Sequence, residues 1–408
     1  MKRFFSGNKV GVVFLTALLI RLCILLCLSP RIQNMENERM GDASDYKAIA
    51  RHWSRGFPHV LDPNAELPNG SNRAPLYPLF LSLVAYPRDS SWMGGRLLGC
   101  LWGAGIAVAC LLLGKVTIGQ KSSWIAGLLC GIYPFLVFYS LLILTETLFT
   151  LFLTISLFFW CMAREKGNLR SIVFLGISLA LSALTRPVVL LLPLLIAGDV
   201  IREKRKMSHG LLLCLTFFFL LSPYLVMQRI QYGCWIPITT EGGRSFYQGN
   251  NPMNRSGGAI RGVDYEYPSW AENMNEAASS RALMAEGLRY VLDRPLLFLL
   301  RASKKVARLW AFIPSQASGF QGIWTSLANA FVVLPLYGLA FLGAIMSRSE
   351  WRKQIPLYVI LLYTTLFCAV FTGSQRFRLP LVPCLAIWAS APLQAVSARL
   401  CRRPPQTP

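Results

Sequence analysis

The sequence predicts an all-α protein that crosses a membrane about ten times. Of its 408 residues, 54% are hydrophobic and only 15% are charged, whereas soluble domains carry nearer ~25% charge. Apolar stretches of roughly 18 or more residues recur along the whole chain. Most basic residues fall in short joints between these stretches, as the positive-inside rule expects for cytoplasmic loops.

The first expected span covers residues 10–29, and the bases before it favour a cytoplasmic N-terminus. Its apolar run is too long for a cleaved signal peptide. A first outer loop follows over residues 30–75. Within it, residues 44–55 place apolar side chains on one helical face and predict a short interfacial helix. Residues 75–86 predict a second interfacial segment that is too short to span.

Nine further spans are expected, and the joints between them are alternately basic and almost uncharged. This alternation places both chain ends in the cytoplasm and both large polar loops on the outer side. The expected spans cover residues 92–113, 123–140, 141–163, 170–185, 187–201, 210–228, 323–346, 355–371 and 379–397.

The second outer loop covers residues 230–322 and is rich in glycine turns. Its later part, residues 295–313, is apolar but carries four bases, which are Arg301, Lys304, Lys305 and Arg308. Each charge at the centre of a bilayer costs at least ~2.5 kcal/mol. We therefore expect an interfacial helix here, with its basic face toward lipid headgroups.

The net charge of +22 does not indicate nucleic-acid binding, because no basic domain stands apart from the membrane. The chain has no close cysteine or histidine pairs of the zinc type. His52, His59 and Asp62 share the first outer loop, but their spacing fits no metal motif. We therefore expect no metal site, no cofactor and no nucleic-acid partner.

Six short motifs occur in a fixed order along the chain. They are Asp42 with Tyr46, Arg73-Ala74-Pro75-Leu76-Tyr77, Thr145-Glu146, Arg186-Pro187, Gly249-Asn250-Asn251-Pro252 and Arg376-Phe377-Arg378-Leu379-Pro380. Together with the topology, they resemble the bacterial branch of glycosyltransferase family 39. These are GT-C membrane enzymes that include the lipid A aminoarabinose transferases and, more distantly, the protein O-mannosyltransferases.

The resemblance covers nearly the whole chain and implies one GT-C helical bundle over residues 1–408. Two departures matter. The aminoarabinose transferases carry Asp-Glu where this chain has Asp42-Ala43. Many relatives also continue into an outer soluble domain where this chain has a short basic tail, so the acceptor stays open.

The family's reaction moves a sugar, with inversion, from a polyprenyl phosphate to an acceptor hydroxyl outside the membrane. The resemblance implies that Asp42 is the base that takes the hydroxyl proton. It also places Arg73 at the family's phosphate-binding basic position, and a guanidinium group matches phosphate oxygens and the charge that develops on them. Arg186 and Arg376 are expected as partners of Arg73 on the donor phosphate, because both lie at outer ends of spans in the topology. Supporting or substrate contacts are expected from Asp45, Tyr46, Tyr77, Glu146, Asn250 and Arg378.

Alternatives stay open for several of these residues. Asp45 is the fallback base, and the three arginines could instead anchor span ends at the interface. Arg21, inside the first span, is close enough to its outer end to snorkel. Glu146 could form a structural ion pair, and Gly249 to Pro252 could be a simple turn.

Two other functions also remain open. A transporter or lipid flippase is one, although such proteins usually show paired halves with broken helices. An O-antigen polymerase or ligase is another, although its main outer loop lies late in the chain. A bacterial inner membrane with a periplasmic site is the expected location. The sequence leaves the sugar, the polyprenol and the acceptor (lipid, glycan or protein) undetermined.

Overall fold

The computed structural model describes residues 8–39, 41–56, 59–61, 69–85, 91–204, 206–312 and 323–400. Apart from one isolated bridge between Arg261 and Tyr265, these residues contain no β-structure. The all-α prediction is confirmed. Asp62, which shares the first outer loop with His52 and His59, lies outside the described residues.

The first half of the chain contains both long apolar helices and short helices. In order they are α2 (Asn8–Arg39), α3 (Gly41–Ser54), α4 (Leu76–Val84), α5 (Met93–Thr117), α6 (Gln120–Ile132), α7 (Pro134–Ser140), α8 (Glu146–Lys166), α9 (Leu169–Thr185), η1 (Pro187–Val189), α10 (Leu192–Lys204) and α11 (Met207–Tyr232).

The second half begins with four helices in the expected second outer loop and returns to long apolar helices. They are α12 (Glu241–Gly249), α13 (Ser269–Glu272), α14 (Glu276–Asp293), α15 (Pro295–Trp310), α16 (Ile323–Met346), η3 (Arg348–Glu350), α17 (Ile355–Val370), η4 (Gln375–Leu381) and α18 (Val382–Leu400).

The number of full-length spans is smaller than the ten expected. Six described segments are long and apolar enough to cross a membrane, namely α2, α5, α8, α11, α16 and η4 with α18. A seventh is the pair α6 and α7, which bends by 54°. Helices α9, α10 and α17 have 17, 13 and 16 residues. At 1.5 Å per residue they reach only ~26, ~20 and ~24 Å, short of a ~30 Å hydrocarbon core.

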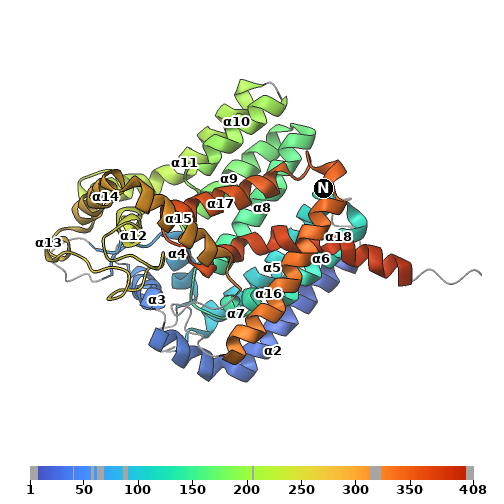
Figure 1. Ribbon diagram of the computed structural model, residues 1–408, viewed down its shortest axis with the longest axis horizontal. Helices are drawn as coiled ribbons and strands as arrows, with labels where there is room; N and C mark the ends of the chain where they lie inside the picture. The colour runs from blue at the N-terminus through green and yellow to red at the C-terminus, as the bar shows by residue number, and fades with distance from the viewer. Residues whose placement is uncertain are drawn as a thin grey trace, which may run out of the picture.

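The bundle has two chemically different ends, which Figure 1 separates clearly. Helices α3, α4 and α12 to α15 gather at one end, which we call the loop end, whereas α10 lies away from it. Side-chain contacts define the opposite, basic end. Lys204 donates to the carbonyl of Glu165 at 2.9 Å, and Arg164 donates to that of Arg352 at 3.4 Å. Helix α8 connects the two ends.

The expected helix is present as α15, but Arg301 and Lys305 on its basic face point into the protein rather than toward lipid. Arg301 and Lys305 are buried and donate to the carbonyl of Asn251 at 2.7 Å and the amide oxygen of Asn250 at 2.9 Å. Leu296, at 76% exposed, lies on the opposite side. The expectation that the bases face headgroups is wrong for Arg301 and Lys305, because the carbonyl oxygens of Asn251 and Pro252 and the amide oxygen of Asn250 need buried donors.

Arg21 also differs from its expected position at the interface. Its side chain is fully buried and donates to the carbonyls of Ala17 and Gly131, each at 2.8 Å, and to the hydroxyl of Ser140 at 3.1 Å. Gly131 lies beside the bend between α6 and α7. Arg21 therefore supplies donors where the broken helix leaves carbonyls without their own.

Candidate active site

Helix α3 carries the aspartate on which the predicted chemistry depends. The helix begins three residues earlier than expected, so Asp42 lies in its first turn. A carboxylate there is favoured by the positive end of the helix dipole. Tyr46, Ile49 and Ala50 recur at helical spacing and are all buried. Their burial fixes the helix rotation and leaves Asp42 and Asp45 partly exposed.

Arg73 lies on the short segment that leads into α4, and it meets both aspartates. Its Nη2 is 2.7 Å from Asp42 Oδ1, and its Nε is 3.0 Å from Asp45 Oδ2. His59 fixes the backbone here, because its Nε2 donates to the carbonyl of Arg73 at 2.9 Å. Burial lowers the pKa of His59 to about 4, so this imidazole is neutral at physiological pH.

Two more arginines approach from distant parts of the chain. Arg376 in η4 places Nη1 3.0 Å from Asp42 Oδ2 and Nε 2.7 Å from Glu146 Oε1. Arg186, which ends α9, places Nη1 2.9 Å from the same oxygen of Glu146. The result is a chain of alternating charge through Asp45, Arg73, Asp42, Arg376, Glu146 and Arg186. We call these six residues the charge cluster.

Exposure differs strongly within the charge cluster. The side chain of Glu146 is 1% exposed, whereas those of Asp42 and Arg376 are 32% and 33% exposed. Glu146 is thus the buried anchor of two arginines, and Asp42 lies where a substrate can reach it. The second oxygen of Glu146 has no hydrogen-bond partner among the described residues.

The arginines control the acidity of Asp42. Burial alone would raise its pKa, but Arg376 and Arg73 outweigh burial and hold the pKa well below its ordinary value. Asp42 is therefore fully ionised in this arrangement. Burial also opposes the charge of Arg73, but Asp42 raises the pKa of Arg73 above its usual range.

Two tyrosine rings, those of Tyr46 and Tyr77, pack beside Arg73. The guanidinium carbon of Arg73 lies 5.5 Å from the ring centroid of Tyr46, within the range of a cation–π contact. Tyr77 packs edge-on against Tyr46, with centroids 5.2 Å apart. Both rings are buried, so they position Arg73.

Two of the predicted site residues contact other parts of the loop end. Asn250 accepts from Lys305 and donates to the carbonyl of Val370 at 2.9 Å. Arg378 donates to the carbonyl of Ala311 at 2.7 Å and to the hydroxyl of Tyr337 at 2.8 Å. These contacts join α12, α15, α16, α17 and η4, and in the described part of the chain neither residue is hydrogen-bonded to the charge cluster.

Glu241, at the start of α12, is a neighbour that the sequence did not single out. Burial raises its pKa, and Arg73 opposes that increase through its charge, as does a hydrogen bond from Ser245. Glu241 is thus a further carboxyl group within electrostatic reach of Asp42 and Arg73. No motif marks it, and only the tertiary fold brings the start of α12 within electrostatic reach of Arg73.

The fold matches membrane enzymes of known structure. The apo Archaeoglobus fulgidus oligosaccharyltransferase is similar with a TM-score of 0.58 at 14% identity, over 97% of this chain and 51% of that one. Archaeoglobus fulgidus AglB, in complex with an inhibitory peptide and a dolichol-phosphate, gives 0.56 at 14% identity over the same shares. The chain spans about half the length of this oligosaccharyltransferase. It therefore has the GT-C fold of membrane glycosyltransferases.

The sequence comparison points to a particular family within that class. Residues 72–227 match the dolichyl-phosphate-mannose-protein mannosyltransferase family, in agreement with the resemblance seen in the motifs. ArnT from Cupriavidus metallidurans bound to undecaprenyl phosphate is a further structural match, with a TM-score of 0.38 and 14% identity over 96% of this chain and 81% of that one. No curated protein matches the sequence.

Proposed function

We propose that this protein is an inverting glycosyltransferase that moves a sugar from a polyprenyl-phosphate donor to an acceptor hydroxyl at the outer face of a membrane. The observation that carries this proposal is the position of Asp42. It is a partly exposed carboxylate whose two oxygens are each held by a different arginine, Arg73 and Arg376. A base and phosphate-binding groups thus lie within one hydrogen bond of each other.

The reaction needs one proton transfer and one displacement at the sugar. Asp42 takes the proton of the acceptor hydroxyl, and the hydroxyl oxygen bonds to the anomeric carbon. The bond from that carbon to the phosphate oxygen breaks on the opposite side, so configuration inverts. The leaving polyprenyl phosphate is already a stable anion and needs positive charge rather than a proton. Arg73, Arg186 and Arg376 supply that charge.

The charge cluster also sets the order of events. When no donor is bound, Arg73, Arg186 and Arg376 form ion pairs with carboxylates. The low pKa of Asp42 then makes it a weak base. A donor phosphate competes for the same guanidinium groups. As Arg73 and Arg376 turn toward phosphate oxygens, Asp42 loses its positive neighbours and its pKa rises. Donor binding therefore activates the base.

The two ends of the bundle suit an orientation with the site outside. The basic end carries the joints that the positive-inside rule assigns to the cytoplasm. The loop end carries the charge cluster and the short helices α3, α4 and α15. We assign the loop end to the periplasmic face of a bacterial inner membrane and both chain ends to the cytoplasm. Helices α3 and α15 then lie at the interface.

Two comparisons support the choice of donor. The matching family model is that of dolichyl-phosphate-mannose-protein mannosyltransferases. An enzyme of the same fold, AglB, has been solved with a dolichol-phosphate. A lipid-linked phosphate is also what three arginines at the edge of a bilayer would bind.

The test uses native membranes that contain wild-type protein, Asp42→Asn or Asp293→Asn. Asp293 is exposed at the end of α14 and serves as a matched control for the same substitution. Each membrane receives a panel of polyprenyl-phosphate hexoses and pentoses. Mass spectrometry then follows the release of free polyprenyl phosphate and the mass added to membrane acceptors.

The expected result is release from one donor by wild type and Asp293→Asn, with at least a ~100-fold loss in Asp42→Asn. The donor that reacts identifies the sugar, and the added mass identifies the acceptor class. Release from no donor by folded wild-type protein would overturn the proposal and favour transport. Equal release by Asp42→Asn would remove Asp42 as the base and leave Asp45 and Glu241 to be tested.

A further inference from the structure

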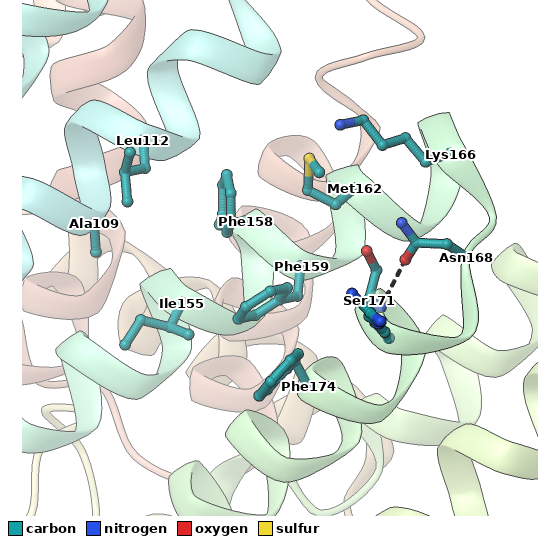
Figure 2. Close-up of a pocket in the computed structure, with 11 residues that line it drawn as sticks. Ala109, Leu112, Ile155, Phe158, Phe159, Met162, Lys166, Asn168, Ser171 and Phe174 are labelled. Atoms are coloured by element: carbon teal, nitrogen blue, oxygen red, sulfur yellow. Dashed lines mark hydrogen bonds between the residues drawn. The ribbon is translucent and has the colours of Figure 1, made fainter. Parts of the chain in front are cut away.

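A groove at the basic end has features that the proposed reaction does not use; its rim, at Lys166, lies about 30 Å along α8 from Glu146 of the charge cluster. It has a volume of about 350 Å³, within the ~300–1,000 Å³ range of ligand pockets. Figure 2 shows aromatic rings of α8 and α9 facing Leu112 of α5 across this hollow.

The inner part of the groove is apolar and rigidly built. Phe159 and Phe174 stack with centroids 5.2 Å apart at 19°. Phe158 meets Phe159 edge-on, also at 5.2 Å. Phe174 is 42% exposed, so the groove opens on the outer surface of the bundle. Such a surface, between two membrane helices, faces lipid rather than water.

The rim of the groove is positively charged. Lys166, at the end of α8, and Arg170, in the first turn of α9, both line it and are exposed. Asn168 lies between them and accepts a hydrogen bond from the backbone of Ser171 at 2.8 Å, which fixes the start of α9 (Figure 2). The two bases therefore project from a well-defined turn.

The depth of the groove matches one leaflet of a bilayer. Ile155, the deepest residue of α8 in the lining, precedes Lys166 by eleven positions, or ~16 Å along the helix. Half of a ~30 Å hydrocarbon core is ~15 Å. An acyl chain that enters beside Lys166 would thus end near Ile155.

We propose that this groove binds one anionic phospholipid of the leaflet at the basic end. One acyl chain lies along Phe158, Phe159 and Phe174, and the lipid phosphate lies between Lys166 and Arg170. Charge complementarity selects an anionic headgroup over a zwitterionic one, since juxtamembrane bases attract anionic lipid. The polyprenyl donor is a poorer candidate, because its phosphate is needed at the other end of α8.

The experiment measures lipid binding to the purified, delipidated full-length protein by native mass spectrometry. The probes are phosphatidylglycerol and phosphatidylcholine with identical acyl chains, with undecaprenyl phosphate as a competitor. We expect phosphatidylglycerol to bind at least ~10-fold more tightly than phosphatidylcholine. Lys166→Gln/Arg170→Gln should remove that preference.

Two control variants test whether the lipid preference comes from this site rather than from nonspecific positive charge or from misfolding. Lys121→Gln/Arg348→Gln removes two exposed bases elsewhere at the basic end and should leave the preference unchanged. Phe174→Glu places a charge at an exposed position of the groove and should weaken both lipids. Equal binding of the two lipids, equal losses in the two double variants, or displacement by equimolar undecaprenyl phosphate would each overturn the proposal.

Discussion

Arg376 contacts Glu146 through two nitrogens, Nε at 2.7 Å and Nη2 at 2.6 Å, while its third nitrogen lies 3.0 Å from Asp42. One guanidinium group thus joins a buried structural carboxylate to the exposed carboxylate proposed as the base. The geometry of the site therefore depends on an ion pair inside the bundle. Both stability and activity should respond to it.

The ion pair between Glu146 and Arg376 should appear as strong coupling in a double-mutant cycle. Glu146→Gln leaves Arg376 paired only with Asp42, and Arg376→Gln leaves the buried Glu146 paired only with Arg186, so each should cost at most ~3–5 kcal/mol of unfolding free energy. The double variant should cost less than the sum, with a coupling of ~1–3 kcal/mol. Denaturant unfolding in detergent measures each variant.

The matched control is the pair Glu350 and Lys353, whose side chains are 49% and 60% exposed. Its coupling in the same cycle should stay below ~1 kcal/mol. Additive losses for Glu146 and Arg376 would show that the contact contributes no specific energy.

The low pKa of Asp42 predicts different acid limits for kcat/KM and kcat. Its pKa is depressed in the free protein, so the free carboxylate is lost only as pH falls below the ordinary value of ~4. The acid limb of kcat/KM, which reports the free enzyme, should therefore lie below ~pH 4. When Arg73 and Arg376 bind the donor phosphate instead of Asp42, the acid limb of the kcat profile should move to higher pH.

A pH–rate profile at limiting and saturating donor measures both limbs. Coincident limbs would contradict the transfer of the arginines to the phosphate. The Asp42→Glu variant keeps a carboxylate. Its kcat/KM and kcat profiles should therefore still have separate acid limbs, even if its rate is low.

Lys305 should make the protein less stable as pH falls from 10 to 7. Burial lowers the pKa of this lysine to about 7, helped by the positive charge of Arg301. Between that value and the unfolded value of ~10.4, the unfolded chain binds more protons than the folded one. Stability therefore rises with pH across this window, by up to ~1.4 kcal/mol per unit. Lys305→Met removes this contribution.

Thermal unfolding from pH 7 to 10 tests the effect of Lys305. The slope of midpoint against pH should be smaller in Lys305→Met than in wild type. Lys304→Met is the matched control, because Lys304 is the exposed neighbour in the same helix. Identical slopes in wild type and Lys305→Met would show that Lys305 does not titrate in this range.

Two glycines of α12 should respond oppositely to alanine. A Cβ at Gly249 would lie 1.7 Å from the carbonyl oxygen of Phe371, which is backbone and cannot move aside easily, whereas one at Gly242 meets nothing within 4 Å. Gly249→Ala should destabilise by ~1–3 kcal/mol. Gly242→Ala should be neutral or stabilising. Thermal unfolding and transfer activity check both variants, and equal tolerance would mean that the contact with α17 is not tight.

Much of the charge cluster could be predicted because each member sits beside a helix end on one side of the membrane. The order of spans alone places Asp42, Arg73, Arg186 and Arg376 at the same end. Glu146 follows from its position at the start of α8. The topology thus predicts a common surface, although no sequence rule gives the pairing of particular oxygens and nitrogens.

The errors have a different physical origin. Periodicity shows that Arg301 and Lys305 share a helix face, but not whether that face meets lipid or protein. For Arg301 and Lys305, tertiary contacts decide the outcome. Asn250 and Arg378 bind backbone carbonyls of distant segments, which the sequence did not indicate, and their roles toward substrate stay predictions. Helices α9 and α17 cover nearly the residues of their expected spans, 170–185 and 355–371, but with 17 and 16 residues each is shorter than a ~30 Å hydrocarbon core.

The distance in sequence between Asp42 and Arg376, 334 residues, has a consequence for biosynthesis. During translation, Arg376 is synthesised long after four other members of the charge cluster, which are Asp42, Arg73, Glu146 and Arg186. Until η4 is inserted, Glu146 has only Arg186 and Asp42 has only Arg73 as an opposite charge. On the proposed function, we expect a nascent chain to be inactive at every length short of η4. A product that stops before η4 leaves the cluster with three carboxylates and two guanidinium groups, and therefore with a net negative charge inside the bundle.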